Sequence, residues 1–373
     1  MTIKYRMCNR CVLDTTATEI EFDEKGFCNY CTKYLNKAGE RKSRYNNITN
    51  LVKKIKDTGR GSKYDCIFGL SGGLDSTWGL KVLVEQGLRP LVVHMDNGWN
   101  SELAQNNIHN IVEKLNVELH THVISWSEYR DLMQSFFDAD VIDIELLMDQ
   151  AFTGALYKQA RRYKVKYILT GQNTSNEGMG MPKGWNWYKN DKSNILDIWK
   201  KYGKLKKIKT FPFFGTFEWL YCKYIKKIEW IRFLDYFEFN DDLVKEILVK
   251  DYDYKLYKFK HGESIFTKFY QGYILPKKFN VDKRKLHLST KILSGQITRE
   301  SVLLILKEEP YHNKMELSED IDYVSKKMMW TDSYLHEYIK RPPVGHAEYK
   351  TETRLLAFML RVKAFIWRYL RVN

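Results

Sequence analysis

Phe68-Gly69-Leu70-Ser71-Gly72-Gly73-Leu74-Asp75-Ser76-Thr77 is the stretch that decides the predicted fold. Residues 64–68 are typical of a short buried strand, and residues 77–85 have the apolar spacing of a helix. The paired glycines let the backbone approach an anion closely, and Asp75 or Ser76 can cap the helix. Because the first turn of a helix presents N–H groups and the positive end of its dipole, this strand–loop–helix unit predicts a phosphate site.

The same loop resembles a known signature. It lacks the lysine and the spacing of a Walker A loop. At all six positions Ser71–Ser76 is similar to the SGGxDS motif of the PP-loop (N-type) ATP pyrophosphatases. The resemblance implies an α/β fold with a parallel-sheet PP-loop ATP pyrophosphatase core, adenine nucleotide alpha hydrolase-like. Such enzymes split ATP between its α and β phosphates and adenylylate a carbonyl oxygen. The competing interpretation is a glycine-rich turn that binds nothing.

Composition sets the broad class. The 373 residues are 44% hydrophobic, enough for one α/β core with appendages. No run of about 18 apolar residues predicts a transmembrane helix, and the first residues lack the apolar core of a signal peptide, so we expect a cytoplasmic protein. The net charge of +15 suits nucleic acid, anionic nucleotides or an acidic membrane surface. It also fits an AT-rich genome, so it discriminates poorly.

Two C-x2-C motifs lie near the N-terminus, sixteen residues apart. They consist of Cys8 and Cys11, then Cys28 and Cys31. This spacing predicts a four-thiolate structural zinc site in a zinc-ribbon-like module over residues 1–45, with a turn at Gly26. A pair of redox motifs is the alternative, disfavoured because two would fall within about thirty residues. Cys66 and Cys222 are expected to be packing residues.

Strand and helix patterns then alternate, as in an α/β core over residues 46–180. Strands are predicted at 91–95, 118–124 and 165–169, and helices at 102–115, 128–137 and 146–163. Ligands bind at the carboxyl ends of parallel strands. Three polar turns follow strands there: Ser71–Ser76, Asp96–Gly98 and Thr170–Asn173. We expect them to meet at one edge of the sheet.

The PP-loop resemblance assigns roles to these turns. The residues it implies for ATP are Ser71, Gly72, Gly73, Asp75, Ser76, Met95, Thr170 and Gly171. Asp75 and Asp96 are the candidates for Mg2+ or for positioning ATP, although Asp96 also fits a simple turn residue. Asp149 opens a predicted helix and can face the same crevice, or serve as a helix N-terminal charge.

Residues 181–260 read as a basic, aromatic-rich insertion. Lys183–Asn194 can stack on a sugar nucleotide or form a lid. Phe217–Phe237 is helix-like and mixes aromatics with lysines. This region fits single-stranded nucleic acid, a peripheral membrane contact, or a helix pair with its aromatics buried against the core. The last of these is the default interpretation.

Residues 261–373 are predicted to be mostly helical, with possible phosphate or substrate contacts. Five cations fall within nine residues: Lys277, Lys278, Lys283, Arg284 and Lys285. They can form a phosphate clamp that completes the pyrophosphate site, or only a solvated face.

The order of motifs is similar to that of the N-acetyl sugar amidotransferases of O-antigen or nonulosonic acid synthesis. The motifs are the two C-x2-C pairs, Asp149–Gln159, Thr170–Asn173, Lys209–Pro212, Thr267–Arg284 and Ser294–Glu300. The resemblance implies adenylylation of an N-acetyl carbonyl on an activated sugar, with ATP and Mg2+, followed by attack of ammonia to give an acetamidino group. Lys278 is assigned with Asp75 and Asp96 to catalysis, and Asp149, Gln172, Asn173 and Arg284 to substrate.

Ammonia needs a source, and the sequence shows no glutaminase motif. The resemblance implies a separate glutaminase of the imidazole glycerol phosphate synthase type, with a cyclase-like companion. Two other functions compete: a PP-loop enzyme that thiolates tRNA or forms lysidine, favoured by the positive charge, and a non-catalytic zinc-ribbon protein that binds nucleic acid or membrane.

Overall fold

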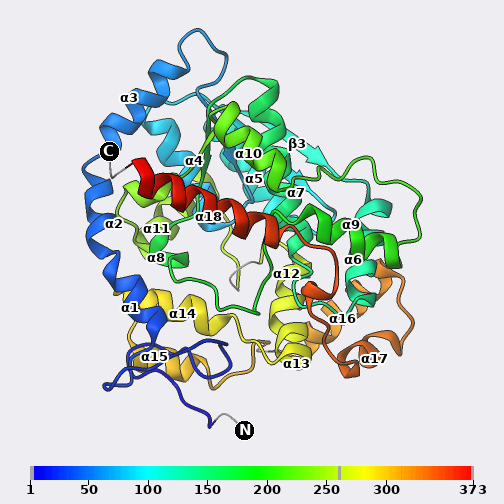
Figure 1. Ribbon diagram of the computed structural model, residues 1–373. Coiled ribbons are helices and arrows are strands. Elements are labelled where there is room, and N and C mark those ends of the chain that lie inside the picture. The colour runs from blue at the N-terminus through cyan, green and yellow to red at the C-terminus, as the bar shows by residue number, and fades with distance from the viewer. Residues whose placement is uncertain (1–3, 259–261, 312, 371–373) are drawn as a thin grey trace.

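The computed structural model describes residues 4–258, 262–311 and 313–370. It contains a five-stranded parallel sheet, whose edge strand β3 is seen in the upper part of Figure 1. The strands are β1 (Cys66–Gly69), β2 (Pro90–Asp96), β3 (Glu118–Val123), β4 (Tyr167–Thr170) and β5 (Glu229–Arg232). Their order is β3-β2-β1-β4-β5, and every neighbouring pair is parallel. The four predicted strands and the α/β class are therefore confirmed.

Helices cover both faces of this sheet, which explains why β1 and β2 are almost continuously apolar. The core helices are α3 (Ile48–Thr58), α4 (Leu74–Glu85), α5 (Glu102–Lys114), α6 (Trp126–Asp138) and α7 (Leu146–Arg162). Phe68 of β1 packs in one cluster with residues of α3, α4 and α5. The adjacent Ile67 points to the other face and packs with α7. This alternation buries β1 from both sides and fixes its register.

The fifth strand lies in the segment expected to be an insertion. We predicted a helix-like stretch over residues 217–237, and the structure differs. Helix α10 (Thr216–Leu220) continues into a π-helical turn over Tyr221–Ile225, and then β5 and a 3-10 turn over Phe233–Tyr236 follow. Trp230 and Ile231 of β5 pack on opposite faces of the sheet. That two-residue alternation is a strand pattern, and pairing with β4 stabilises it. The sheet thus extends beyond the expected boundary at residue 180.

The N-terminal region around the two C-x2-C motifs contains isolated bridges and a turn before its first helix. Isolated antiparallel bridges join Met7 to Asp14 and Phe22 to Cys28. Gly26 forms the predicted turn with a φ of 77° and donates its N–H to the carbonyl of Asp23 at 2.9 Å. The second C-x2-C motif opens α1 (Asn29–Asn36), which is followed by α2 (Ala38–Tyr45).

The predicted helical C-terminal region is confirmed. It contains α12 (Ile265–Phe269), α13 (Leu275–Phe279), α14 (Arg284–Leu293), α15 (Arg299–Ile305), α16 (Lys314–Met328), α17 (Tyr334–Lys340) and α18 (Thr353–Leu370), with a π-helical turn over Tyr270–Ile274 and a 3-10 turn over His346–Glu348. Helices α8 (Thr174–Glu177) and α9 (Lys192–Tyr202) come between β4 and β5 in the chain, and α11 (Asp241–Tyr252) follows β5. One hydrophobic cluster runs from Cys8 through Phe136 and Phe269 to Tyr349, so distant segments share a core.

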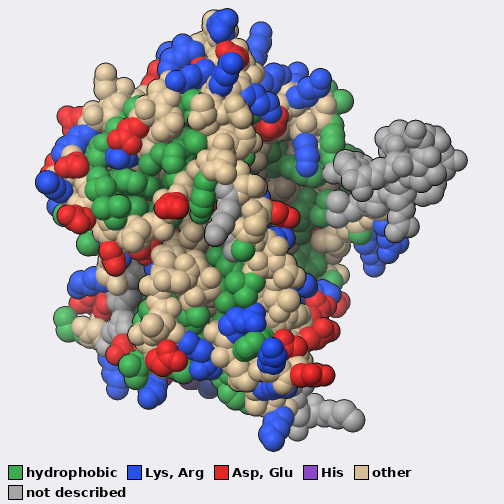
Figure 2. Space-filling model, turned by 90° about the vertical axis from the view of Figure 1, so that its left-hand side faces the viewer, with side chains coloured by type: hydrophobic (Ala, Val, Ile, Leu, Met, Phe, Trp, Pro, Cys, Tyr) green, Lys and Arg blue, Asp and Glu red, His purple; other side chains and the backbone are tan. Residues whose placement is uncertain are grey.

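Two surface observations complete the description. Seen from the side of α1–α3, basic side chains gather at the upper end, while acidic and basic groups alternate below (Figure 2). Among the described residues, no helix combines the length and the apolar character needed to cross a membrane.

Candidate nucleotide site and four-cysteine cluster

The Ser71–Ser76 loop leaves the carboxyl end of β1 and turns into α4, whose N-cap is Gly73. Two serines shape it: the Gly73 N–H donates to Ser71 Oγ at 3.2 Å, and Ser76 Oγ donates to the Gly73 carbonyl at 3.1 Å. Gly72 has a φ of +84°, and a Cβ there would lie 2.9 Å from the Ala104 carbonyl. The expected side-chain cap from Asp75 or Ser76 is absent from this helix, because Gly73 occupies the cap position. The loop therefore presents its backbone and the start of α4 at the sheet edge.

The carboxylate of Asp75 sits in a polar network that the sequence did not reveal. Asn176 Nδ2 donates to Asp75 Oδ1 at 3.0 Å and to Asp241 Oδ1 at 3.1 Å. Gln296 Nε2 donates to Asn176 Oδ1 at 3.2 Å, and Lys291 pairs with Asp241. Helices α8, α11 and α14 thus converge on Asp75. The sequence feature that could have pointed to Asn176 is its position three residues after the Thr170–Asn173 turn.

The end of β4 packs directly against the loop. A Cβ on Gly171 would lie 2.5 Å from both the Asp75 carbonyl oxygen and Ser76 Cα, so the approach requires glycine. Thr170 Oγ1 and Asn173 Nδ2 are buried and have no protein hydrogen-bond partner among the described residues. Since buried polar groups are normally paired, both atoms are suited to contact a bound nucleotide. Gln172 is exposed beside them.

The turn after β2 contains the second candidate carboxylate. Asp96 Oδ1 accepts the N–H of Gly98 at 2.8 Å and Nδ2 of Asn100 at 3.3 Å. Asn100 Nδ2 also donates to His94 Nε2 at 2.9 Å, and His94 Nδ1 lies 2.9 Å from the Leu70 carbonyl. Burial lowers the pKa of His94, which keeps the ring neutral. Asp96 is thus a turn residue, which was one of the two interpretations of this position. Both of these hydrogen bonds are accepted by Oδ1 and neither by Oδ2. The Met95 side chain is in the core.

Asp149 approaches the same edge from α7. A Cβ on Gly69, at the end of β1, would touch Phe152 and Leu156, so this face of α7 lies over β1. Asp149 precedes Phe152 by one turn and is therefore directed beyond the strand end. Its carboxylate is 2.8 Å from Lys189 Nζ; desolvation by the surrounding protein and the charges of Asp143 and Glu145 raise its pKa, although 42% of the side chain remains exposed.

The predicted phosphate clamp is wrong. Lys278 has no exposed side-chain surface, and its Nζ lies 2.6 Å from the Tyr338 carbonyl, 2.7 Å from the Arg341 carbonyl and 2.9 Å from Asp140 Oδ1. Arg284 is held by Asp282 at 2.8 Å and by the Glu308 carbonyl at 2.9 Å. Two more of the five cations are paired, Lys283 with Glu145 and Lys285 with Asp14, both at 2.5 Å, and Lys277 is exposed on α13. These groups stabilise helices, so Lys278 is not placed in catalysis, nor Arg284 in substrate binding.

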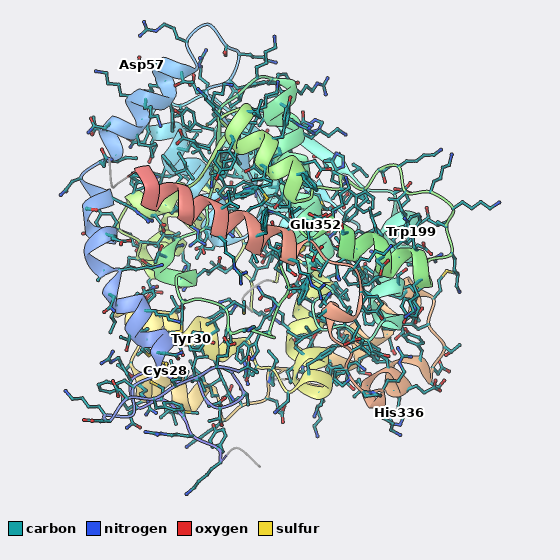
Figure 3. The ribbon with its side chains drawn as sticks, viewed as in Figure 1. Cys28, Tyr30, Asp57, Trp199, His336 and Glu352 are labelled. Carbon is teal, nitrogen blue, oxygen red and sulfur yellow. The ribbon has the colours of Figure 1, made fainter. Side chains whose placement is uncertain are left out.

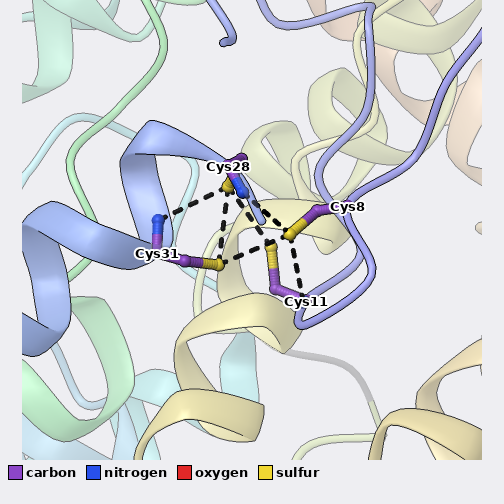
Figure 4. Close-up of side chains that lie close together, drawn as sticks. All are labelled: Cys8, Cys11, Cys28 and Cys31. Carbon is purple, nitrogen blue, oxygen red and sulfur yellow. Dashed lines mark hydrogen bonds between the residues drawn. The ribbon is translucent and has the colours of Figure 1, made fainter. Parts of the chain in front are cut away.

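The four N-terminal thiols converge in one buried cluster (Figure 4). Sγ–Sγ distances are 3.7 Å for Cys8–Cys31, 3.8 Å for Cys11–Cys28 and 3.4 Å for Cys28–Cys31, and all four sulfurs lie within 4.8 Å of one another. A tetrahedral zinc ion with bonds of about 2.3 Å separates its sulfurs by about 3.8 Å. The donor set therefore fits zinc. A four-iron cluster binds each thiolate through a different iron and needs wider spacing.

The cluster is attached to the C-terminal helices. Arg299, which opens α15, donates from Nε to the Cys11 carbonyl and from Nη2 to the Cys8 carbonyl, both at 3.0 Å. Figure 3 shows Cys28 and Tyr30 at the start of α1, beside α14 and α15. The other cysteines, Cys66 and Cys222, are buried and burial raises the pKa of each thiol, which disfavours a nucleophilic thiolate.

Comparison with known proteins adds a family to the C-terminal region. Residues 263–363 match the family model described as LPS biosynthesis protein WbpG-like, C-terminal domain. An uncharacterized protein of Methanocaldococcus jannaschii is 30% identical over 166 residues, which are 44% of this chain. The chain spans 58% of the length of that relative.

Solved structures show weaker, fold-level likeness. NH3-dependent NAD synthetase from Campylobacter jejuni matches 42% of this chain and 72% of its own with a TM-score of 0.27 and 19% identity. NMN synthetase from Francisella tularensis matches 59% and 98% with a TM-score of 0.26 and 16% identity. The U34-tRNA thiolase NcsA from Methanococcus maripaludis, with its [4Fe-4S] cluster, matches 80% and 88% with a TM-score of 0.34 and 14% identity. Likenesses at this level do not assign a function.

Sheet order and loop together define the class: an α/β protein whose parallel sheet carries the SGGLDS loop between the end of β1 and the start of α4. Its C-terminal region, residues 263–363, is similar to the WbpG-like C-terminal domain.

Proposed function

We propose that this protein is an ATP-dependent amidotransferase that converts the N-acetyl group of an activated sugar into an acetamidino group during surface polysaccharide synthesis. One observation carries the proposal: an SGGLDS loop at the carboxyl edge of a parallel sheet lies in the same chain as a WbpG-like domain over residues 263–363. The loop supports ATP chemistry, and the domain supports the polysaccharide context.

The chemistry needs ATP because an amide carbonyl is a poor electrophile with a poor leaving group. The carbonyl oxygen attacks the α phosphorus, the bond to the bridging oxygen breaks, and pyrophosphate leaves. Ammonia then adds to the imidate carbon, the C–O bond breaks, and AMP departs. The Ser71–Ser76 loop would hold the leaving pyrophosphate, while Thr170 and Asn173 would contact the nucleoside. Asp75 and Asp96 would hold Mg2+, which neutralises charge on the phosphates.

Ammonia would come from a separate glutaminase. Cys66 and Cys222 are buried with raised pKa values, which supports neither as a glutaminase nucleophile. The purified chain is therefore expected to use ammonium salts and not glutamine. Turnover with glutamine in the absence of a partner would contradict this part of the proposal.

The experiment measures pyrophosphate and AMP release with Mg-ATP, ammonium chloride and a panel of UDP- and CMP-linked N-acetylated sugars. Asp75→Ala is the inactive control. Release stimulated by one sugar, with a product lighter by the exchange of oxygen for NH, supports the amidotransferase. Release stimulated by tRNA alone would instead place the protein among the tRNA-modifying enzymes. The inaccessible Cys66 and Cys222 argue against the thiolase version of that alternative.

A further inference from the structure

The segment between β4 and α9 places one lysine between two carboxylates of the α7 entrance. Lys189 Nζ is 2.7 Å from Asp143 Oδ2 and 2.8 Å from Asp149 Oδ2. The Trp187 N–H donates to Asp143 Oδ2 at 2.8 Å, and the Trp187 ring stacks on His346 at 5.0 Å with an interplanar angle of 14°. These contacts fix the segment, so the position of Lys189 is set by the fold.

Exposure increases along this chain of charges. The Asp143 side chain is 1% exposed, Lys189 is 31% exposed and Asp149 is 42% exposed. Asp143 therefore holds Lys189 on its buried side, whereas Asp149 and Lys189 both keep solvent-exposed side-chain atoms. The neighbouring Glu145 is different, because Lys283 and Gln271 occupy both of its oxygens in a buried arrangement.

The charges do not balance. Lys189 serves two carboxylates, and Lys283 compensates Glu145, which leaves one excess negative charge at the α7 entrance. Burial alone would lower the pKa of Lys189, but the charges of Asp143 and Asp149 raise it, so the lysine stays a cation. The excess negative charge is therefore carried by the exposed carboxylate, Asp149.

Two observations bear on the surroundings of this cluster. Desolvation raises the pKa of buried Tyr129 and the charges of Asp149 and Glu145 add to this, while the Asn97 side chain nearby opposes it. Asn97 directly follows Asp96, so the cluster borders the β2 turn. Gln150, next to Asp149, is completely buried, and both of its amide atoms lack a protein partner among the described residues. Unpaired buried amides are uncommon, so Gln150 leaves two polar atoms beside this cluster for a water molecule or another polar group.

We infer that Asp149 accepts the amide N–H of the N-acetyl group and that Lys189 positions the Asp149 carboxylate for this contact. The inference rests on the proposed function. Accepting the N–H shifts electron density toward the carbonyl oxygen, the atom that must attack the α phosphorus. As the C–O–P bond forms, positive charge develops on the amide nitrogen, and a fixed carboxylate stabilises it. The amidinium product is also a cation. The Asp149 carboxylate therefore attracts the developing positive charge and the product more strongly than the neutral substrate.

The test compares Asp149→Asn, Lys189→Met and Lys189→Arg with the wild type. Lys192→Met is the matched control, because Lys192 is the first residue of the following helix α9, is about as exposed as Lys189 and is paired with Glu218 at 2.5 Å. We expect Asp149→Asn to lower kcat for pyrophosphate release about 100-fold with unchanged ATP affinity. Lys189→Met should act less strongly, and Lys189→Arg should restore activity. The inference would be overturned if Asp149→Asn released pyrophosphate as fast as the wild type. It would also be overturned if the loss of ATP affinity in this variant were as large as its loss of activity.

Acetamidinium chloride provides a readout that does not depend on turnover. Calorimetry should show that this cation binds the wild type and the Lys192→Met variant, and that Asp149→Asn binds it at least about tenfold more weakly. Binding that is insensitive to Asp149 refutes the site. If no sugar stimulates pyrophosphate release by the wild type, the proposed function fails, whereas the acetamidinium titration still decides whether Asp149 holds an amidinium-like group.

Discussion

Replacing Lys278 by Met should destabilise the protein without changing the chemistry of the folded molecules. The substitution removes an ammonium that contacts two buried carbonyl oxygens, of Tyr338 at 2.6 Å and Arg341 at 2.7 Å, and the carboxylate of Asp140 at 2.9 Å. Each buried acceptor left unpaired costs about 1–3 kcal/mol. Asp140 would still pair with the Arg341 guanidinium at 2.9 Å, so its carboxylate would lose only part of its stabilisation. Two such acceptors give about 2–6 kcal/mol, and breaking a buried ion pair typically costs about 3–5 kcal/mol, so we expect a loss of about 3–5 kcal/mol.

Urea unfolding followed by circular dichroism measures this loss, and pyrophosphate release per folded molecule measures the chemistry. Lys277→Met is the matched control, since Lys277 is the exposed neighbour on α13 and its loss should change stability by less than about 0.5 kcal/mol. A Lys278→Met protein with wild-type stability and no ATP turnover would refute the reasoning, because it would return Lys278 to the catalytic site.

Three further predictions address the nucleotide loop, the cysteines and pH. Gly171→Ala should lower kcat/KM for ATP about 100-fold in steady-state assays, because the added methyl would lie 2.5 Å from the backbone of Asp75 and Ser76. Unchanged kinetics of this variant would show that the end of β4 does not approach the loop. Zinc equimolar with protein is expected by elemental analysis, and Cys28→Ser should lose the metal and melt at lower temperature, whereas visible absorption by iron would contradict the assignment. Burial lowers the pKa of His346 from 6.5 to about 4, so the unfolded chain gains a proton before the folded one as pH falls, and stability present above pH 6.5 is lost toward pH 4. Between pH 7 and pH 5 the wild type should lose about 2 kcal/mol more than His346→Asn in urea titrations.

Local patterns in the sequence predicted the parts of this fold that depend on neighbouring residues. The apolar runs before Ser71 and Asp96 gave β1 and β2, and the cysteine spacing gave the thiol cluster. In each case the partner groups are close in the chain or share a periodic pattern. Strand β5 was missed because its two-residue alternation is only four residues long and follows a helix rich in the same aromatics.

The surroundings of individual charges were not predictable in this way. Lys278 and Arg284 lie in a run of cations, and such a run does not reveal that Asp140, more than a hundred residues away, encloses Lys278. Asn176 likewise meets Asp75 across 101 residues. Specific side-chain partners of this kind arise from tertiary packing, which no periodicity encodes. Lys189 was part of a predicted substrate segment, but its pairing with Asp149 required the structure.

The attachment of Arg299 to the two cysteine loops has a consequence for the order in which the chain folds. Its acceptor carbonyls on Cys11 and Cys8 lie 288 and 291 residues earlier in the sequence. During synthesis the N-terminal thiols leave the ribosome long before α14 and α15 exist. A metal ion can hold the small module in its final shape throughout that interval, since the four ligands are local. Docking of Arg299 onto this module then closes a loop of 288 residues, and contacts of such long range form late and slowly.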